Sequence, residues 1–226
     1  MRILVSVLLV LCLGVGQGWA KVSVSPVIIE ATEVKKGDVF QVLCAQEGSE
    51  PLNVQLSLAL FDQDGDGNVF FLEDPESVHL AHRVLRLEQE QFSIGPQEQH
   101  GVEIEVLEDD FTSFYAVLFV KPDQPGIPTR FAVLFLLSSS GLREEVTVST
   151  WEQKAESLEL TIVNSGTRHG LWRGELLLYD SSGNLNEKRE VQSGVVLAGR
   201  SREWGISLPA WVQHVELTTP RQGADR

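Results

Sequence analysis

Apolar and polar residues alternate along much of this chain, which is the pattern of β-strands that bury one face. The run 54–60, VQLSLAL, places an apolar residue at every even position, and the run 102–106, VEIEV, separates three apolar residues with glutamates. Such runs recur between turns rich in Gly, Pro and Asp, as in a β-sandwich. Only residues 77–86 give a helical signal, and it is weak. In the first half, strands are predicted at 22–30, 39–45, 54–61, 69–72, 84–87, 102–106, 114–120 and 130–137.

The composition changes after residues 138–141, and the second half has its own set of predicted strands. Both halves contain an apolar strand that ends in an aromatic residue and an aspartate before a Gly-Asn turn, LALFDQDGDGN in the first and LLLYDSSGN in the second. This weak repetition favours two related sandwiches, over residues 21–140 and 141–226. Strands are predicted here at 146–151, 157–163, 174–179, 185–191, 194–197, 202–208 and 214–218.

The stretch 129–140, TRFAVLFLLSSS, departs from the alternating pattern because residues 131–137 are all apolar. Seven residues are too few for a membrane span and fit a strand of about 23 Å. Both faces of such a strand need cover. One face can belong to the core of its own domain. The other needs a second layer, a neighbouring domain or a partner protein.

Residues 1–20 have the features of a secretory signal peptide. Arg2 precedes a short apolar core, and small residues at Gly18 and Ala20 mark a cleavage site before Lys21. Cleavage would remove Arg2 alone among the charged residues and lower the net charge from −14 to −15. We therefore expect a periplasmic or secreted protein that neither binds nucleic acid nor inserts into a membrane after cleavage.

Cys44 is the only cysteine outside the predicted signal peptide, since Cys12 lies within it. No disulfide can therefore form within the mature chain. A lone cysteine in an exported protein is most often a small buried apolar residue, and we expect this of Cys44.

The first half resembles the periplasmic pilus-assembly chaperones, the PapD-like family. VSVSPVIIEATEVKKGD is similar to their first strand and turn, and QFSIGPQEQHGVEIEV to their Pro-Gly turn and following strand. Part of the family's D…FY..L…P signature is also present. Its positions are Asp109, Phe114, Tyr115, Leu118 and Pro122, while Phe111 and Val117 replace two of its polar residues. The resemblance extends from residue 22 to about 140.

This resemblance implies two immunoglobulin-like β-sandwich domains in tandem and a chaperone function. In the family, the strand matching residues 130–137 lends alternate apolar side chains to an unfinished pilin subunit, and a basic pair anchors the carboxylate of the pilin. The implied partner is a protein subunit of a surface fibre or pilus. No basic residue occurs in 22–30, and the lending strand ends in serines at 138–140.

A period of two divides the lending strand into two sets of side chains whatever its register. We predict that the larger set faces the partner, because Ala132 in the smaller set suits a close-packed interior. The predicted partner-binding residues are Phe131, Val133, Phe135 and Leu137; the opposite set is Ala132, Leu134 and Leu136.

The segment 62–73, DQDGDGNVFFLE, matches the pattern of an EF-hand calcium loop. Its flanks read as strands rather than helices. If residues 69–72 are extended, Glu73 lies about 16 Å from Asn68 and cannot close the loop. The alternatives are a hairpin turn that carries acids and a calcium site. The candidate metal ligands are Asp62, Asp64, Asp66 and Asn68.

No motif of a nucleophilic enzyme or a phosphate-binding loop is present, and we do not expect an enzyme. The HxxH of His79 and His82 has no third ligand nearby in the sequence. The main rival to the chaperone hypothesis is a secreted adhesive or structural immunoglobulin-like module, stabilised by calcium. A weaker alternative is a carbohydrate-binding sandwich that uses the tryptophans of the second half.

Overall fold

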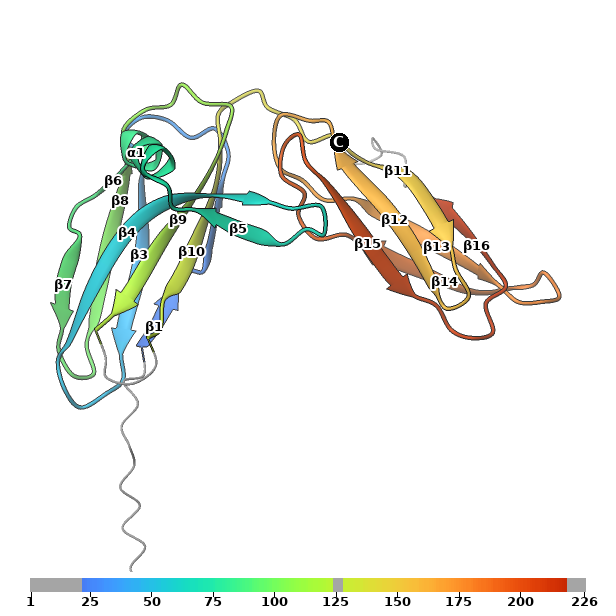
Figure 1. Cartoon of the computed structure of the whole chain (residues 1–226), viewed down its shortest axis with the longest axis horizontal. Coiled ribbons are helices and arrows are strands. Elements are labelled where there is room, and N and C mark those ends of the chain that lie inside the picture. The colour runs from blue at the N-terminus through green and yellow to red at the C-terminus, as the bar shows by residue number, and fades with distance from the viewer. Residues whose placement is uncertain (1–21, 124–127, 219–226) are drawn as a thin grey trace, which may run out of the picture.

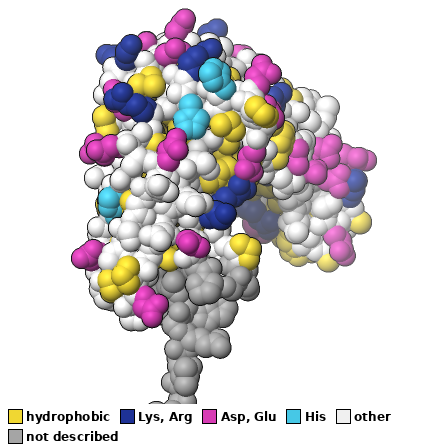
Figure 2. Space-filling view, turned by 60° about the vertical axis from the view of Figure 1, so that its left-hand side comes forward, with side chains coloured by type: hydrophobic (Ala, Val, Ile, Leu, Met, Phe, Trp, Pro, Cys, Tyr) yellow, Lys and Arg dark blue, Asp and Glu magenta, His cyan; other side chains and the backbone are white. Residues whose placement is uncertain are grey.

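The computed structural model describes residues 22–123 and 128–218, and it contains two β-sandwiches joined at an angle (Figures 1 and 2). The predicted signal peptide lies outside the described residues. The predicted domain boundary at residue 140 falls in the connection between the last strand of one sandwich and the first strand of the other. The prediction of an all-β fold with two sandwiches is confirmed.

The first sandwich consists of two sheets. One, which we call the β3 sheet, has the order β1 (Val22–Ser25), β3 (Val39–Gln46), β8 (Gln99–Val106), β6 (Leu85–Leu87). The other, the β9 sheet, has the order β2 (Ile28–Ala31), β10 (Phe131–Ser138), β9 (Ser113–Pro122), β4 (Leu52–Gln63), β5 (Val69–Leu72), and β7 (Gln91–Ile94) also pairs with β4. The predicted strand 22–30 is thus two strands in different sheets, interrupted at Pro26, which has no N–H for a ladder.

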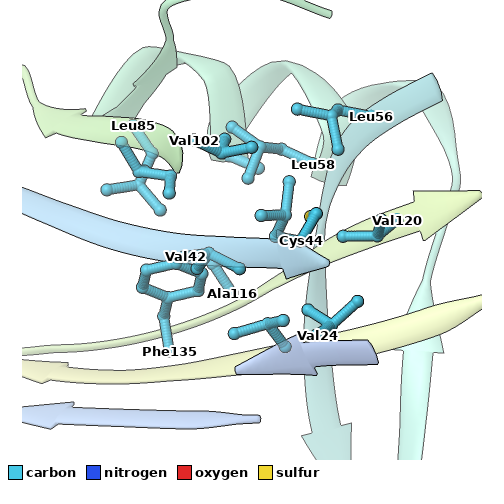
Figure 3. Packing of buried hydrophobic residues seen from close by; sticks show 14 of the residues in the cluster. Val24, Val42, Cys44, Leu56, Leu58, Leu85, Val102, Ala116, Val120 and Phe135 are labelled. Carbon is cyan, nitrogen blue, oxygen red and sulfur yellow. The ribbon is translucent and has the colours of Figure 1, made fainter. Parts of the chain in front are cut away.

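The core of the first sandwich lies between these sheets and follows the alternation in the sequence (Figure 3). The even-numbered residues of β4 from Leu52 to Leu60 face inward, and Leu58 is only 1% exposed. Cys44 on β3 is fully buried, as predicted, and burial raises the pKa of its thiol to about 11. The thiolate is therefore scarce at neutral pH, and the cysteine is part of the packing.

The second sandwich has a smaller core between two three-stranded sheets. The orders are β11 (Val146–Gln153), β12 (Ser157–Asn164), β15 (Ser201–Ser207) and β14 (Leu185–Gln192), β13 (Arg173–Tyr179), β16 (His214–Thr218). Leu158, Leu160 and Ile162 on β12 fill this core, as their alternation with polar residues indicates. The predicted strand 194–197 is instead a loop with one isolated bridge, between Gly170 and Val196.

The helix α1 (Pro75–Val84) lies beside β4, and it begins two residues before the weak helical signal at 77–86. Its start is fixed by Asp74, whose side chain accepts hydrogen bonds from the N–H groups of Glu76 and Ser77, with Pro75 in the first turn. Within the described residues, no helix has the length and hydrophobicity to cross a membrane.

Candidate partner-binding edge and interdomain contacts

The strand β10 separates its side chains into two sets, but the inward set is the one predicted to face a partner. Val133, Phe135 and Leu137 are fully buried in the core between the two sheets, and Phe131 packs against that core. The ring of Phe135 meets that of Phe40 on β3 edge-on, with centroids 6.0 Å apart. The prediction that these side chains face outward is therefore wrong. The β9 sheet needs large side chains here to reach the opposite sheet.

The smaller set, Ala132, Leu134 and Leu136, lies on the outer face of the β9 sheet in a second apolar cluster. This cluster also contains Val117 and Phe119 of β9, Val78 of α1 and, from the second domain, Leu197. Both faces of β10 are thus apolar, and the second domain covers part of the outer face. A neighbouring domain was one of the three kinds of cover that the sequence led us to expect. Ala132 and Leu134 are only partly buried.

The edge of β10 is covered along only half of its length. β9 pairs with all of residues 131–138, whereas β2 pairs in parallel only with residues 134–137. The N–H of Leu134 donates to Val27 O, on the side away from β9. Because these directions alternate along a strand, the N–H and C=O of Ala132 also point away from β9, toward an edge with which no described strand pairs.

Exposed apolar side chains lie next to this open edge. Val27 is 58% exposed and Ile28 is 54% exposed, and Ile28 lies directly opposite Leu134 on the outer face. An open edge beside apolar side chains is suited to pairing with another extended chain. The site is therefore formed by residues 131–133 of β10 with Val27 and Ile28.

The hairpin of β4 and β5 extends out of the first sandwich and reaches the second domain (Figure 1). Gln63, at the end of β4, is buried at this contact. Its side-chain amide donates to Val195 O at 2.9 Å and accepts from the N–H of Leu197 at 3.3 Å. One side chain of the first domain thus satisfies two backbone groups of the second.

Further contacts attach the same hairpin to β15. The N–H of Glu203 donates to Gly65 O at 2.7 Å. Arg200 forms a bidentate ion pair with Asp62, and this pairing raises the pKa of the arginine. Gly67 has a φ of 84° and lies so close to the Arg202 guanidinium that a Cβ would collide with it. Glycine is therefore needed at this position for two reasons: it adopts the positive φ of the turn, and its lack of a side chain leaves room for Arg202 of the second domain.

The acidic residues of this hairpin do not converge. Asp62 binds Arg200, and Asp64 accepts hydrogen bonds from the N–H groups of Asp66 and Asn68 and from the Asn68 side chain. These bonds, above all that from the Asn68 side chain, lower the pKa of Asp64. In residues 22–123 and 128–218, no three His, Cys, Asp or Glu side chains form a metal-binding group. The structure therefore does not assemble the four candidate ligands into a site.

Glu73 is also placed as the strand pattern requires. β5 is extended and antiparallel to β4, so Glu73 lies at the far end of the strand from the turn, where it forms a bidentate pair with Arg130. The segments on both sides of the turn are strands, β4 and β5. The turn therefore has the sequence pattern of an EF-hand loop without the flanking helices of an EF-hand.

Calcium binding by the turn stays a prediction. If Asp64 and Asp66 bind the ion, added calcium should raise the melting temperature through binding linkage, and D64A with D66A should abolish the rise. Thermal melts with and without millimolar calcium test this, with magnesium as the control. An unchanged melting temperature in the wild type would leave these acids a role in the turn alone.

Two interdomain residues carry no sequence signal that predicts their role. His169, in a loop of the second domain, is 2% exposed, and its Nε2 lies 2.9 Å from Glu30 Oε1 on β2. Tyr115, noted in the FY pair of the signature, accepts a hydrogen bond from the N–H of Ala198 through its hydroxyl. Burial raises the pKa of Tyr115. Its neighbour Phe114 faces the core of the first domain. The FY pair therefore contributes Phe114 to the core and Tyr115 to the contact between the domains.

The tryptophans of the second domain are divided between core and surface. Trp172 is 2% exposed and meets Trp204 edge-on, whereas Trp151 on β11 and Trp211 before β16 are 45% and 40% exposed. Two of the four therefore serve the core, which weakens the case for an aromatic sugar-binding platform.

No protein-family model and no curated protein matches this sequence. Solved structures do match its fold. The class 5 fimbriae chaperone CfaA superposes with a TM-score of 0.57 at 10% identity, over 91% of this chain and 95% of that one.

Two other matches have similar values. A chain of the CsuC–CsuE chaperone–tip adhesion subunit complex of Acinetobacter baumannii gives a TM-score of 0.52 at 14% identity, over 83% of this chain and 91% of that one. The chaperone YadV gives 0.51 at 12%, over 87% and 90%. At such low identity the likeness concerns the fold. The resemblance noted in the sequence is thereby confirmed at that level: this chain has the two-domain immunoglobulin-like fold of the fimbrial chaperones.

Proposed function

We propose that this protein is an exported chaperone that binds subunits of a surface fibre by pairing one of their strands with β10. The observation that carries the proposal is the open edge of residues 131–133, beside the exposed Val27 and Ile28, in a chain with the fold of fimbrial chaperones. Both the backbone groups and the apolar surface that strand addition requires are present there.

The partner class follows from the same likeness. One matching structure is a pre-assembly complex of a chaperone with a tip adhesion subunit, and another is a chaperone–tip adhesin complex. For this chain we infer a protein partner with an incomplete β-sandwich. The function is binding rather than catalysis, and the predicted signal peptide would take the protein to the periplasm or beyond.

A proline at position 132 tests the edge. The N–H of Ala132 points away from β9, so A132P removes a donor from the open edge without breaking the ladder with β9. A132V keeps that donor and is the matched control. Purified variants are incubated with the native exported fraction, and bound fibre subunits are identified and quantified. We expect wild type and A132V to form a 1:1 complex and A132P to bind about tenfold less, with similar melting temperatures.

Equal binding by A132P and A132V would contradict strand addition at this edge. Failure of the wild type to bind any fibre subunit would contradict the chaperone function and favour a secreted structural or adhesive module.

A further inference from the structure

The opposite edge of the β9 sheet, formed by β5, is also open. No described strand lies beyond β5. Asn68 O accepts from the N–H of Asp64 on the β4 side, so by alternation the backbone groups of Val69 and Phe71 point to the open side. This edge is separate from that of β10, with β9 and β4 between them.

The side chains of β5 are unusually apolar for an open edge. Val69, Phe70 and Phe71 are 40%, 44% and 36% exposed. Edge strands are normally protected by lysine, proline or a covering segment, because exposed apolar edges pair with other chains. β5 has no such residue. The ladder with β4 holds the strand extended, and Phe71 rests on Phe119, with ring centroids 5.0 Å apart, beside the Arg130 guanidinium.

Carboxylates lie at both ends of β5. Asp64 and Asp66 precede the strand, and Asp74 and Glu76 follow it, all exposed. None of these four forms an ion pair with a described residue, whereas Glu73 is neutralised by Arg130. The nearby cation on the other side of the turn is Arg202, beside Gly67. The local charge is therefore strongly negative.

We propose that β5 is a second strand-addition edge, whose partner is an extended segment with an apolar centre and lysine or arginine on both sides. The apolar side chains of the centre would cover Phe70, and the basic flanks would meet the two pairs of carboxylates. A second copy of this chain does not fit, since antiparallel pairing of two β5 strands brings acids against acids in a chain of net charge −14. This inference does not depend on the function of β10.

The probe is a synthetic peptide of alternating valine and threonine with lysine pairs at both ends, labelled for fluorescence anisotropy. A peptide with glutamate pairs is the charge control. We expect the wild-type chain to bind the lysine peptide at low ionic strength, with binding that weakens as salt is added, and not the glutamate peptide.

Three variants locate the site. F70S removes an exposed anchor and should weaken binding about tenfold, while L185S removes an equally exposed residue of the edge strand β14 and should change nothing. D66K with E76K, which leaves the capping bonds of Asp64 and Asp74 in place, should abolish the preference for the lysine peptide, because each pair of carboxylates becomes one acid and one base. A132P should bind the lysine peptide like wild type, which separates this edge from that of β10.

Equal binding of both peptides, no binding of either, or equal effects of F70S and L185S would overturn the proposal. So would a wild-type dimer in sedimentation experiments that F70S dissociates, because the occupant would then be a second copy.

Discussion

Replacing Phe135 with serine should unfold the first domain, whereas replacing its neighbour Leu134 with serine should leave the domain folded. Loss of a fully buried aromatic side chain typically costs about 3–5 kcal/mol, and the serine hydroxyl would be buried without a partner. An ordinary domain is stable by only about 5–15 kcal/mol, so the two losses together approach the whole stability at the lower end of that range. Leu134 is only partly buried, in the outer cluster, and its truncation should cost roughly 1–2 kcal/mol.

Thermal and denaturant melts of F135S and L134S measure this difference. The small size of Ala132 favoured the opposite result, with Ala132 in the core and Phe135 outward. Equal loss of stability in the two variants would show that the outer face of β10 is as buried as the inner one, and an unaffected F135S would contradict the core described here.

The second large effect is expected from Gln63, which joins the two domains. Q63L has a similar volume but leaves Val195 O and the N–H of Leu197 without their partners. A buried backbone group without a hydrogen bond costs about 1–3 kcal/mol. We expect the interdomain contact to open, with a larger radius of gyration in solution scattering and a lower melting temperature.

Q55L is the matched control, since Gln55 lies on the same strand but is exposed. It should leave both measurements unchanged. If Q63L scatters and melts like the wild type, the hairpin contact does not hold the domains together.

The strands of both sandwiches were predictable because alternation reports which face of a strand is buried. The same rule could not orient β10, whose two faces are equally apolar. The size of Ala132 suggested an interior position, but the strand pairs with β9 so that Ala132 lies opposite Phe119 on the outer face. That choice depends on pairing, which a single strand does not encode.

The interdomain contacts could not be predicted for a different reason. Gln63 and Val195 are 132 positions apart, and Glu30 and His169 are 139 apart. Each is a single polar residue without a periodic pattern around it. The acidic turn matches a calcium-binding motif in its residue types and spacing. The motif could not show that the Asp62 carboxylate pairs with Arg200 of the other domain.

The contact through Gln63 also bears on the order in which the molecule is built. The loop around Val195 and Leu197 is not part of a regular ladder, and it takes two of its backbone hydrogen bonds from the hairpin. Synthesis proceeds from the amino terminus, so the hairpin is available before this loop leaves the ribosome. The earlier domain can therefore act as the template on which the later one completes its fold.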